Sequence, residues 1–128
     1  MTRIILRAEL PFVTVRVSHD GRSIDIPDVL VDTGSASTVL SADVVAGIGI
    51  VPEPTDRLRT LRGVGGREQV FVRSVDRFEL DGHGLEHFEV EVGGMDYGFS
   101  IQGILGMDFL KAMNAVVDLR DLTLDCGE

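Results

Sequence analysis

The chain has 128 residues, of which 44% are hydrophobic and 26% charged, and this size and composition are typical of one globular domain. We therefore expect residues 1–128 to form a single domain. The formal net charge of −9 disfavours nucleic acid and anionic membrane surfaces as partners. Charged residues interrupt the first apolar positions and no apolar run could span a bilayer, so we expect a soluble, cytoplasmic protein.

Alternating apolar and polar residues predict a mainly β fold, beginning with a hairpin that leads to Asp32. Residues 12–17 alternate with a period of two, and the favoured hairpin dipeptide Asp20-Gly21 follows them. The chain then returns through residues 24–31. This pattern predicts that a strand ends directly before Asp32.

A short helical turn and a loop are predicted next. Ser41 precedes residues 42–46 and is placed to act as the N-cap of the turn. Pro52 and Pro54 mark a surface loop. Beyond this loop, two strands are expected to flank residues 63–66, whose sequence is Gly-Val-Gly-Gly.

The second half of the chain predicts two further hairpins and one helix. Apolar and polar residues alternate in the first of these hairpins, so one face of its sheet is expected to be solvated. The predicted elements are strands at 78–80 and 88–92 around the turn 81–84, a helix at 106–113, and a final hairpin at 116–117 and 122–124.

The triplet Asp32-Thr33-Gly34 is the strongest candidate for chemistry. Apolar residues 29–31 run directly into it and the small and apolar residues 35–40 follow, so its carboxylate is held at a tight turn between apolar segments. Such a setting favours a chemically active acid. The alternative interpretation is a plain turn residue, since aspartate is common in turns.

Three segments, in order, resemble the retropepsins, the retroviral-type aspartic peptidases and their bacterial relatives. Residues 32–40 (DTGSASTVL) are similar to the active-site segment, 63–66 (GVGG) to the tip of the flap hairpin, and 104–110 (ILGMDFL) to the strand and helix that support the active-site loop. The resemblance implies a mainly β, closed β-barrel-like acid-protease fold with one short C-terminal helix and a flap hairpin. It also implies a peptidase that needs no metal and no other cofactor.

A peptidase of this kind needs one group to activate water and another to protonate the product, and two carboxylates that share one proton can do both. The chain has one Asp-Thr-Gly triplet, because Asp108, Asp118 and Asp125 are followed by other residues. We therefore expect a homodimer, in which a two-fold axis brings two copies of Asp32 together. The expected substrates are peptides or proteins.

The resemblance implies roles for individual residues. Asp32 supplies the catalytic carboxylate, Thr33 braces the two loops across the axis, and Gly34 leaves room for the turn and for the substrate backbone. His83 and His87 flank a turn rather than sharing a helix face, so we expect no metal site. The residues expected to bind substrate are Ser35, Ala36, Val39, Gly63, Val64, Gly65, Gly66 and Ile104.

Two positions depart from the retroviral pattern. Ala36 stands where an acid is common and Met107 where an arginine is common, so the sequence lacks an ion-pair network that supports the dimer in that branch of the family. The stability of a dimer must then come from elsewhere, and the terminal strands are candidates.

Two other functions stay open. The first is a peptide-binding or regulatory module that keeps the fold and hydrolyses little. The second is a subunit that is active only with a different partner chain. The intact Asp32-Thr33-Gly34 triplet favours the enzyme, because a pure binding module has no evident need for a carboxylate at this position.

Overall fold

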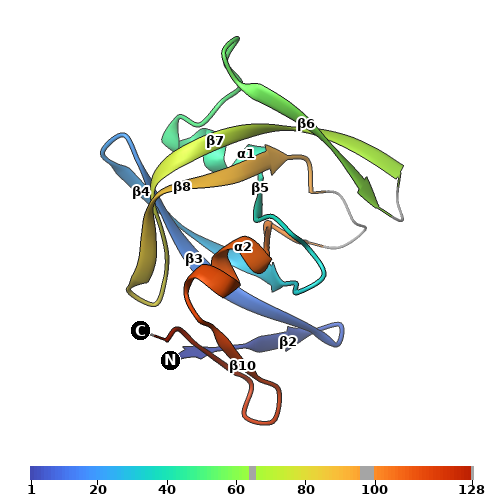
Figure 1. Ribbon diagram of the computed structural model, residues 1–128, viewed down its shortest axis with the longest axis vertical. Coiled ribbons are helices and arrows are strands. Elements are labelled where there is room, and N and C mark those ends of the chain that lie inside the picture. Colours follow the sequence, from blue (N-terminus) through green and yellow to red (C-terminus); the bar gives the residue numbers. More distant parts are fainter. Residues whose placement is uncertain (64–65, 96–99, 128) are drawn as a thin grey trace.

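The computed structural model describes residues 1–63, 66–95 and 100–127 and is mainly β, with 57% strand and 11% helix (Figure 1). Within these ranges no helix is long and apolar enough to cross a membrane. The strands are β1 (Thr2–Arg3), β2 (Ile5–Arg7), β3 (Leu10–His19), β4 (Arg22–Val31), β5 (Val39–Ser41), β6 (Arg57–Gly63), β7 (Gly66–Leu80), β8 (His83–Gly93), β9 (Gly103–Leu105), β10 (Val116–Asp118) and β11 (Thr123–Asp125). The helices are α1 (Ala42–Val45), the 3-10 helix η1 (Ala46–Ile48) and α2 (Met107–Ala112).

The main sheet closes into a barrel. Its strand order is β2-β3-β4-β9-β5-β8-β7-β6, and an additional pairing of β3 with β7 closes the ring β3-β4-β9-β5-β8-β7. Strand β9 lies between β4 and β5, parallel to the first and antiparallel to the second. The predicted acid-protease fold, a closed barrel with a short C-terminal helix, is confirmed.

Both predicted Asp-Gly hairpin turns are present. Asp20 and Gly21 have φ angles of 51° and 78°, and Asp81 and Gly82 have φ angles of 52° and 82°. These left-handed values are the ones that a two-residue type I′ turn requires. The second turn is shorter than predicted, because β8 already begins at His83.

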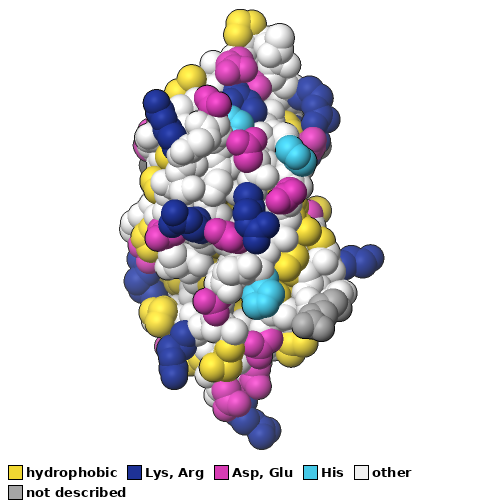
Figure 2. All heavy atoms as spheres, turned by 90° about the vertical axis from the view of Figure 1, so that its left-hand side faces the viewer, with side chains coloured by type: hydrophobic (Ala, Val, Ile, Leu, Met, Phe, Trp, Pro, Cys, Tyr) yellow, Lys and Arg dark blue, Asp and Glu magenta, His cyan; other side chains and the backbone are white. Residues whose placement is uncertain are grey.

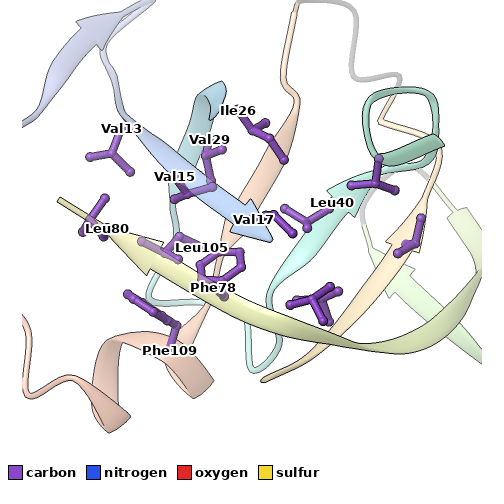
Figure 3. Close-up of a cluster of buried hydrophobic side chains, with 14 of the residues drawn as sticks. Val13, Val15, Val17, Ile26, Val29, Leu40, Phe78, Leu80, Leu105 and Phe109 are labelled. Atoms are coloured by element: carbon purple, nitrogen blue, oxygen red, sulfur yellow. The ribbon is translucent and has the colours of Figure 1, made fainter. Parts of the chain in front are cut away.

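The core fills the barrel with side chains that alternate along its strands (Figure 3). Val13, Val15 and Val17 of β3 point inward and are at most 3% exposed. Phe109 of α2 is fully buried and packs on Phe78 of β7, with ring centroids 5.0 Å apart. This aromatic contact ties the helix to the strand that forms half of the longest hairpin.

The helical turn after β5 begins where it was predicted, but its predicted cap is wrong. Ser41 occupies the N-cap position of α1, and its side chain makes no capping hydrogen bond. Ser41 is also the last residue of β5, and its backbone N–H donates to the carbonyl of Gln102 at 3.0 Å. The sheet therefore fixes this residue, rather than the start of the helix.

A second sheet joins the two ends of the chain in the order β1-β11-β10. Strand β1 pairs antiparallel with β11, and the N–H of Ile4 donates to the carbonyl of Leu122 at 2.8 Å. The predicted final hairpin is present as β10 and β11. The terminal strands thus find partners within the chain, so any contribution to a dimer must come from their outer edges.

Acidic and basic side chains are interspersed over the face seen in Figure 2.

One ion pair with little exposure ties a loop to the barrel. Both oxygens of Asp56 accept from Arg73 of β7, at 3.0 and 2.7 Å, and the same guanidinium donates to the carbonyl of Val51 at 2.8 Å. The hydrogen bond from Arg73 lowers the pKa of Asp56 from its ordinary value of 3.8. Asp56 therefore stabilises the fold in its ionised form.

Replacing Asp56 by Asn should lower the melting temperature, because the amide keeps the shape but loses the charge that pairs with Arg73. A lowered pKa means that this stabilisation is fully present above pH 3.8 and is lost as the pH falls through the folded-state pKa. The difference between wild type and Asp56→Asn should therefore be constant near neutral pH and shrink in acid. Thermal unfolding followed by circular dichroism between pH 7 and pH 2.5 measures it. A constant difference at every pH, or an equal effect of Asp121→Asn at an exposed turn, would contradict this account.

Candidate active site

Asp32 lies where the chain leaves β4, on a loop that returns into β5. Its N–H donates to the carbonyl of Leu105 on β9 at 3.0 Å, which extends the pairing of β4 with β9 by one residue. One oxygen of the Asp32 carboxylate accepts from the N–H of Gly34 at 2.9 Å. The carboxylate is therefore oriented by its own turn, and the turn is fixed to the barrel.

The start of α2 supports the loop from behind. The N–H of Met107 donates to the carbonyl of Ser35 at 2.8 Å, and the N–H of Asp108 donates to the carbonyl of Ala36 at 3.2 Å. The first amides of a helix have no partner within the helix, so these two donors are free to bind another segment. The loop thus uses hydrogen-bonding groups that the helix leaves open.

A buried hydroxyl group joins the loop, β9 and α2. Thr38 is fully buried, and its hydroxyl donates to one oxygen of Asp108 at 2.7 Å while its N–H donates to the other at 3.0 Å. The Thr38 hydroxyl oxygen also accepts from the N–H of Gly106 at 3.1 Å. The hydroxyl of this threonine therefore donates one hydrogen bond and accepts another, and both hold the end of the Asp32 loop.

Two glycines lie in close contact with the Asp32 loop. A Cβ atom on Gly106 would lie 2.3 Å from the carbonyl oxygen of Ser37, which is backbone and cannot rotate away. A Cβ atom on Gly34 would lie 3.2 Å from the Asp32 carboxylate, a tighter contact than most Cβ atoms make. A larger residue at Gly106 would displace the loop that carries the acid, whereas one at Gly34 would shift the Asp32 carboxylate.

One side of the loop is open. Thr33, Gly34 and Ala36 are exposed, Asp32 is partly exposed, and the Met107 side chain is 39% exposed at the start of α2. An exposed methionine beside an exposed turn leaves an apolar and uncharged face next to the acid.

The structure brings some of the predicted substrate residues to Asp32. Ser35 and Ala36 lie on the same loop, and Ile104, which is partly exposed, pairs with Val39 across β9 and β5. Val39 is only 3% exposed, so its side chain offers little surface to a ligand in this chain. The roles of these residues in binding stay predictions.

The predicted flap corresponds to the hairpin of β6 and β7. The backbone ladder of this hairpin extends to the pair Gly63 and Gly66, while Val64 and Gly65 lie outside the described residues. In Figure 1 the far end of the hairpin and the loop between β4 and β5 lie on the same side of the molecule. A hairpin is therefore present where the resemblance implies a flap, and its role stays a prediction.

Sequence reasoning missed two residues that the structure places at the site. Thr38 is held by Asp108, although no local pattern links residues so far apart in the sequence. Glu91 is 2% exposed on β8, and its N–H donates to the carbonyl of Thr38 at 3.0 Å. The alternating pattern predicts that a single acid in such a strand is exposed to solvent, so only the fold shows that Glu91 is buried.

The part of the chain that the structure describes contains no group of three or more His, Cys, Asp or Glu side chains that could hold a metal ion. A carboxylate on a glycine-containing turn, carried by a closed β barrel, is the arrangement expected of the aspartic peptidases. Residues 13–109 match the family described as aspartyl protease, and the chain belongs to this family, which is part of the retropepsin-like clan. A search of curated proteins finds no match. The family membership supports a general aspartic protease function.

Replacing Asp108 by Ala should lower the free energy of unfolding by about 2–3 kcal/mol, because two hydrogen bonds to a charged acceptor are lost and the buried Thr38 donors are left without it. Asp108→Asn should cost less, since its amide oxygen can still accept one of the two bonds. Urea unfolding measures both values. Asp121→Ala, at an exposed turn, is the control, and a loss for Asp108→Ala no larger than the control's would show that the Thr38 contact does not hold the loop.

Proposed function

We propose that this chain is an aspartic endopeptidase subunit that acts as a homodimer, in which Asp32 of each subunit contributes one carboxylate to a shared active site. The observation that carries the proposal is the lone Asp-Thr-Gly turn, fixed to the barrel on one side and exposed on the other. A single carboxylate cannot act as both acid and base in the same step, and a two-fold axis beside the turn would supply the second one.

In this proposal a water molecule lies between the two Asp32 carboxylates, one of which is protonated. The ionised carboxylate takes a proton from the water while the water oxygen attacks the peptide carbonyl carbon. The protonated carboxyl donates its proton to the carbonyl oxygen. The tetrahedral intermediate collapses when the carboxyl that took the proton from water passes it to the leaving nitrogen. The other carboxylate accepts a proton from one of the two hydroxyl groups as the C–N bond breaks, which restores the starting protonation of the pair. No covalent bond to the enzyme forms, and no metal takes part.

The neighbours of Asp32 hold the reacting groups in place. Thr33, which is exposed, would brace the two loops across the axis, and Gly34 would leave room for the substrate backbone. The β6–β7 hairpin would close over the peptide as a flap, because glycines let its tip change conformation and approach the substrate. The residues proposed to contact the peptide are Ser35, Ala36, Val39, Gly63, Val64, Gly65, Gly66 and Ile104.

A peptide-binding module with little hydrolysis is the second candidate. The observation in its favour is that hydrogen bonds within one chain fix the Asp32 turn, so the turn keeps its shape without a second carboxylate. Loss of cleavage without loss of peptide binding in the Asp32→Asn variant would separate the chemistry from the binding, whereas a wild type that binds and never cleaves would favour the module.

Asp32→Asn should reduce peptide hydrolysis by at least about a thousandfold, because the amide cannot take a proton from water. The measurement is the cleavage of a diverse peptide library at several pH values, read by mass spectrometry. EDTA should leave the wild-type rate unchanged. Wild-type turnover in Asp32→Asn, or inhibition by EDTA, would rule out the aspartic mechanism.

Mixing wild type with Asp32→Asn tests the shared site directly. If each active site needs one Asp32 from each subunit, only dimers of two wild-type chains are active. An equal mixture at constant total concentration, after subunit exchange, should then keep about one quarter of the activity of pure wild type. A monomeric enzyme would keep about half, and that result would exclude the dimeric site while leaving the peptidase assignment intact.

A further inference from the structure

A hollow of about 360 Å³ opens between the base of the β6–β7 hairpin and the loop that carries Asp32. Ser37 lines it from the Asp32 loop, Asp108 from α2 and Arg59 from β6. Its remaining wall is formed by residues 85–91 of β8. The hollow therefore touches both parts of the protein between which a peptide would lie.

The unusual feature of this hollow is the buried carboxylate of Glu91. Its side chain is 3% exposed, and one oxygen accepts from Arg59 at 2.8 Å. The other oxygen, Oε2, is buried and has no hydrogen-bonding partner. A carboxylate oxygen that is buried without a hydrogen bond is costly, and few buried polar atoms in folded proteins are left in this state.

The charge around Glu91 favours a positive ligand. Glu86, Glu89 and Asp108 also line the hollow, and Arg59 is the one Lys or Arg side chain among its lining residues. Asp108 already accepts from Thr38, and Glu89 already pairs with Arg57 at 2.5 Å. Glu91 Oε2 is therefore the buried carboxylate oxygen of this hollow that is left to accept a hydrogen bond. An organic cation fits this oxygen better than a metal ion does, because no metal-binding group of three ligands is present among the described residues.

Arg59 stands where the hairpin leaves the barrel. The last described pair of β7 with β8 is Phe71 with Val92, and Arg59 pairs with Val70, one residue further toward the hairpin tip. The Arg59 side chain is 44% exposed, so it can shift without breaking a packed core. A peptide that lies under the hairpin would pass this point after leaving the Asp32 turn, away from the bond that is cut.

We infer that this hollow is a specificity pocket that takes the Lys or Arg side chain of a bound peptide, with Glu91 as the residue that selects it. The inference rests on the proposed function, since the occupant is a side chain of the same peptide that Asp32 would cleave. The exposed Arg59 side chain shifts toward solvent, and the ammonium or guanidinium group of the ligand donates to Glu91 Oε2, which is otherwise buried. Because Asp32 is not among the residues that line the hollow, we expect the pocket to take a side chain away from the scissile bond.

The test places lysine at each position of a cleaved peptide in turn and compares it with norleucine, which has a similar length and no charge. At one position away from the scissile bond, lysine should raise kcat/KM by about tenfold, the effect of one charged hydrogen bond. No position with such a preference, in peptides whose cleavage depends on Asp32, would overturn the pocket and leave the proposed function standing.

Two variants with opposite expected effects separate recognition from mere support of the fold. Glu91→Gln should reduce the ratio of kcat/KM for the lysine and norleucine peptides to about one. Arg59→Met should increase that ratio, because it removes the cation that competes for Glu91. Glu9→Gln, at an exposed turn, should leave the ratio unchanged. If Glu91→Gln and Arg59→Met both lower the ratio, or neither changes it, the ion pair is structural and the inference is wrong.

Binding to the Asp32→Asn protein makes the test independent of cleavage. Fluorescence anisotropy with labelled lysine and norleucine peptides should show tighter binding of the lysine peptide, and Glu91→Gln in the same background should abolish the difference. A lysine preference in binding without any cleavage by wild type would retain the pocket and overturn the peptidase. Equal binding of the two peptides, or no binding of either, would overturn the pocket.

Discussion

The close approach of Gly106 to the carbonyl of Ser37 determines how the Asp32 loop lies on the barrel. Because this position has no side chain, the end of β9 and the start of α2 can pass directly under the loop, and the amides of Met107 and Asp108 reach the loop carbonyls. The same approach puts the hydroxyl of Thr38 within reach of both Gly106 and Asp108. The orientation of the acid thus depends on backbone packing more than on any contact of the carboxylate itself.

The loop and the hairpin that faces it are also connected mechanically. The N–H of Glu91 on β8 donates to the carbonyl of Thr38. The Glu91 side chain accepts a hydrogen bond from Arg59 at the base of the hairpin. A displacement of the hairpin base would therefore be felt at the residue that fixes the end of the loop. This short chain of contacts links the Asp32 loop and the base of the hairpin through one buried acid.

Local patterns predicted much of the fold, since strand alternation and Asp-Gly turns act over a few residues. The turns at Asp20 and Asp81 and the helix after Gly106 lie where the sequence indicated, and the family resemblance held over most of the chain. The sequence could not indicate the pairing of β1 with β11 or the bond between Thr38 and Asp108, because both join segments that only the folded chain brings together. Glu91 was missed for the same reason, since burial of a strand position depends on what packs over it.

The barrel is closed by a short seam, and this has a consequence for the order in which the protein folds. Strands β3 and β7 meet through three residue pairs, which join residues 16–18 to residues 77–79. Bringing such distant segments together lowers the chain entropy before any stabilising contact between them forms. The seam is therefore expected to form after the local hairpins on either side of it. The two hairpins can then act as preassembled units that dock late, and amide hydrogen exchange should find the seam among the first parts of the ladder to open.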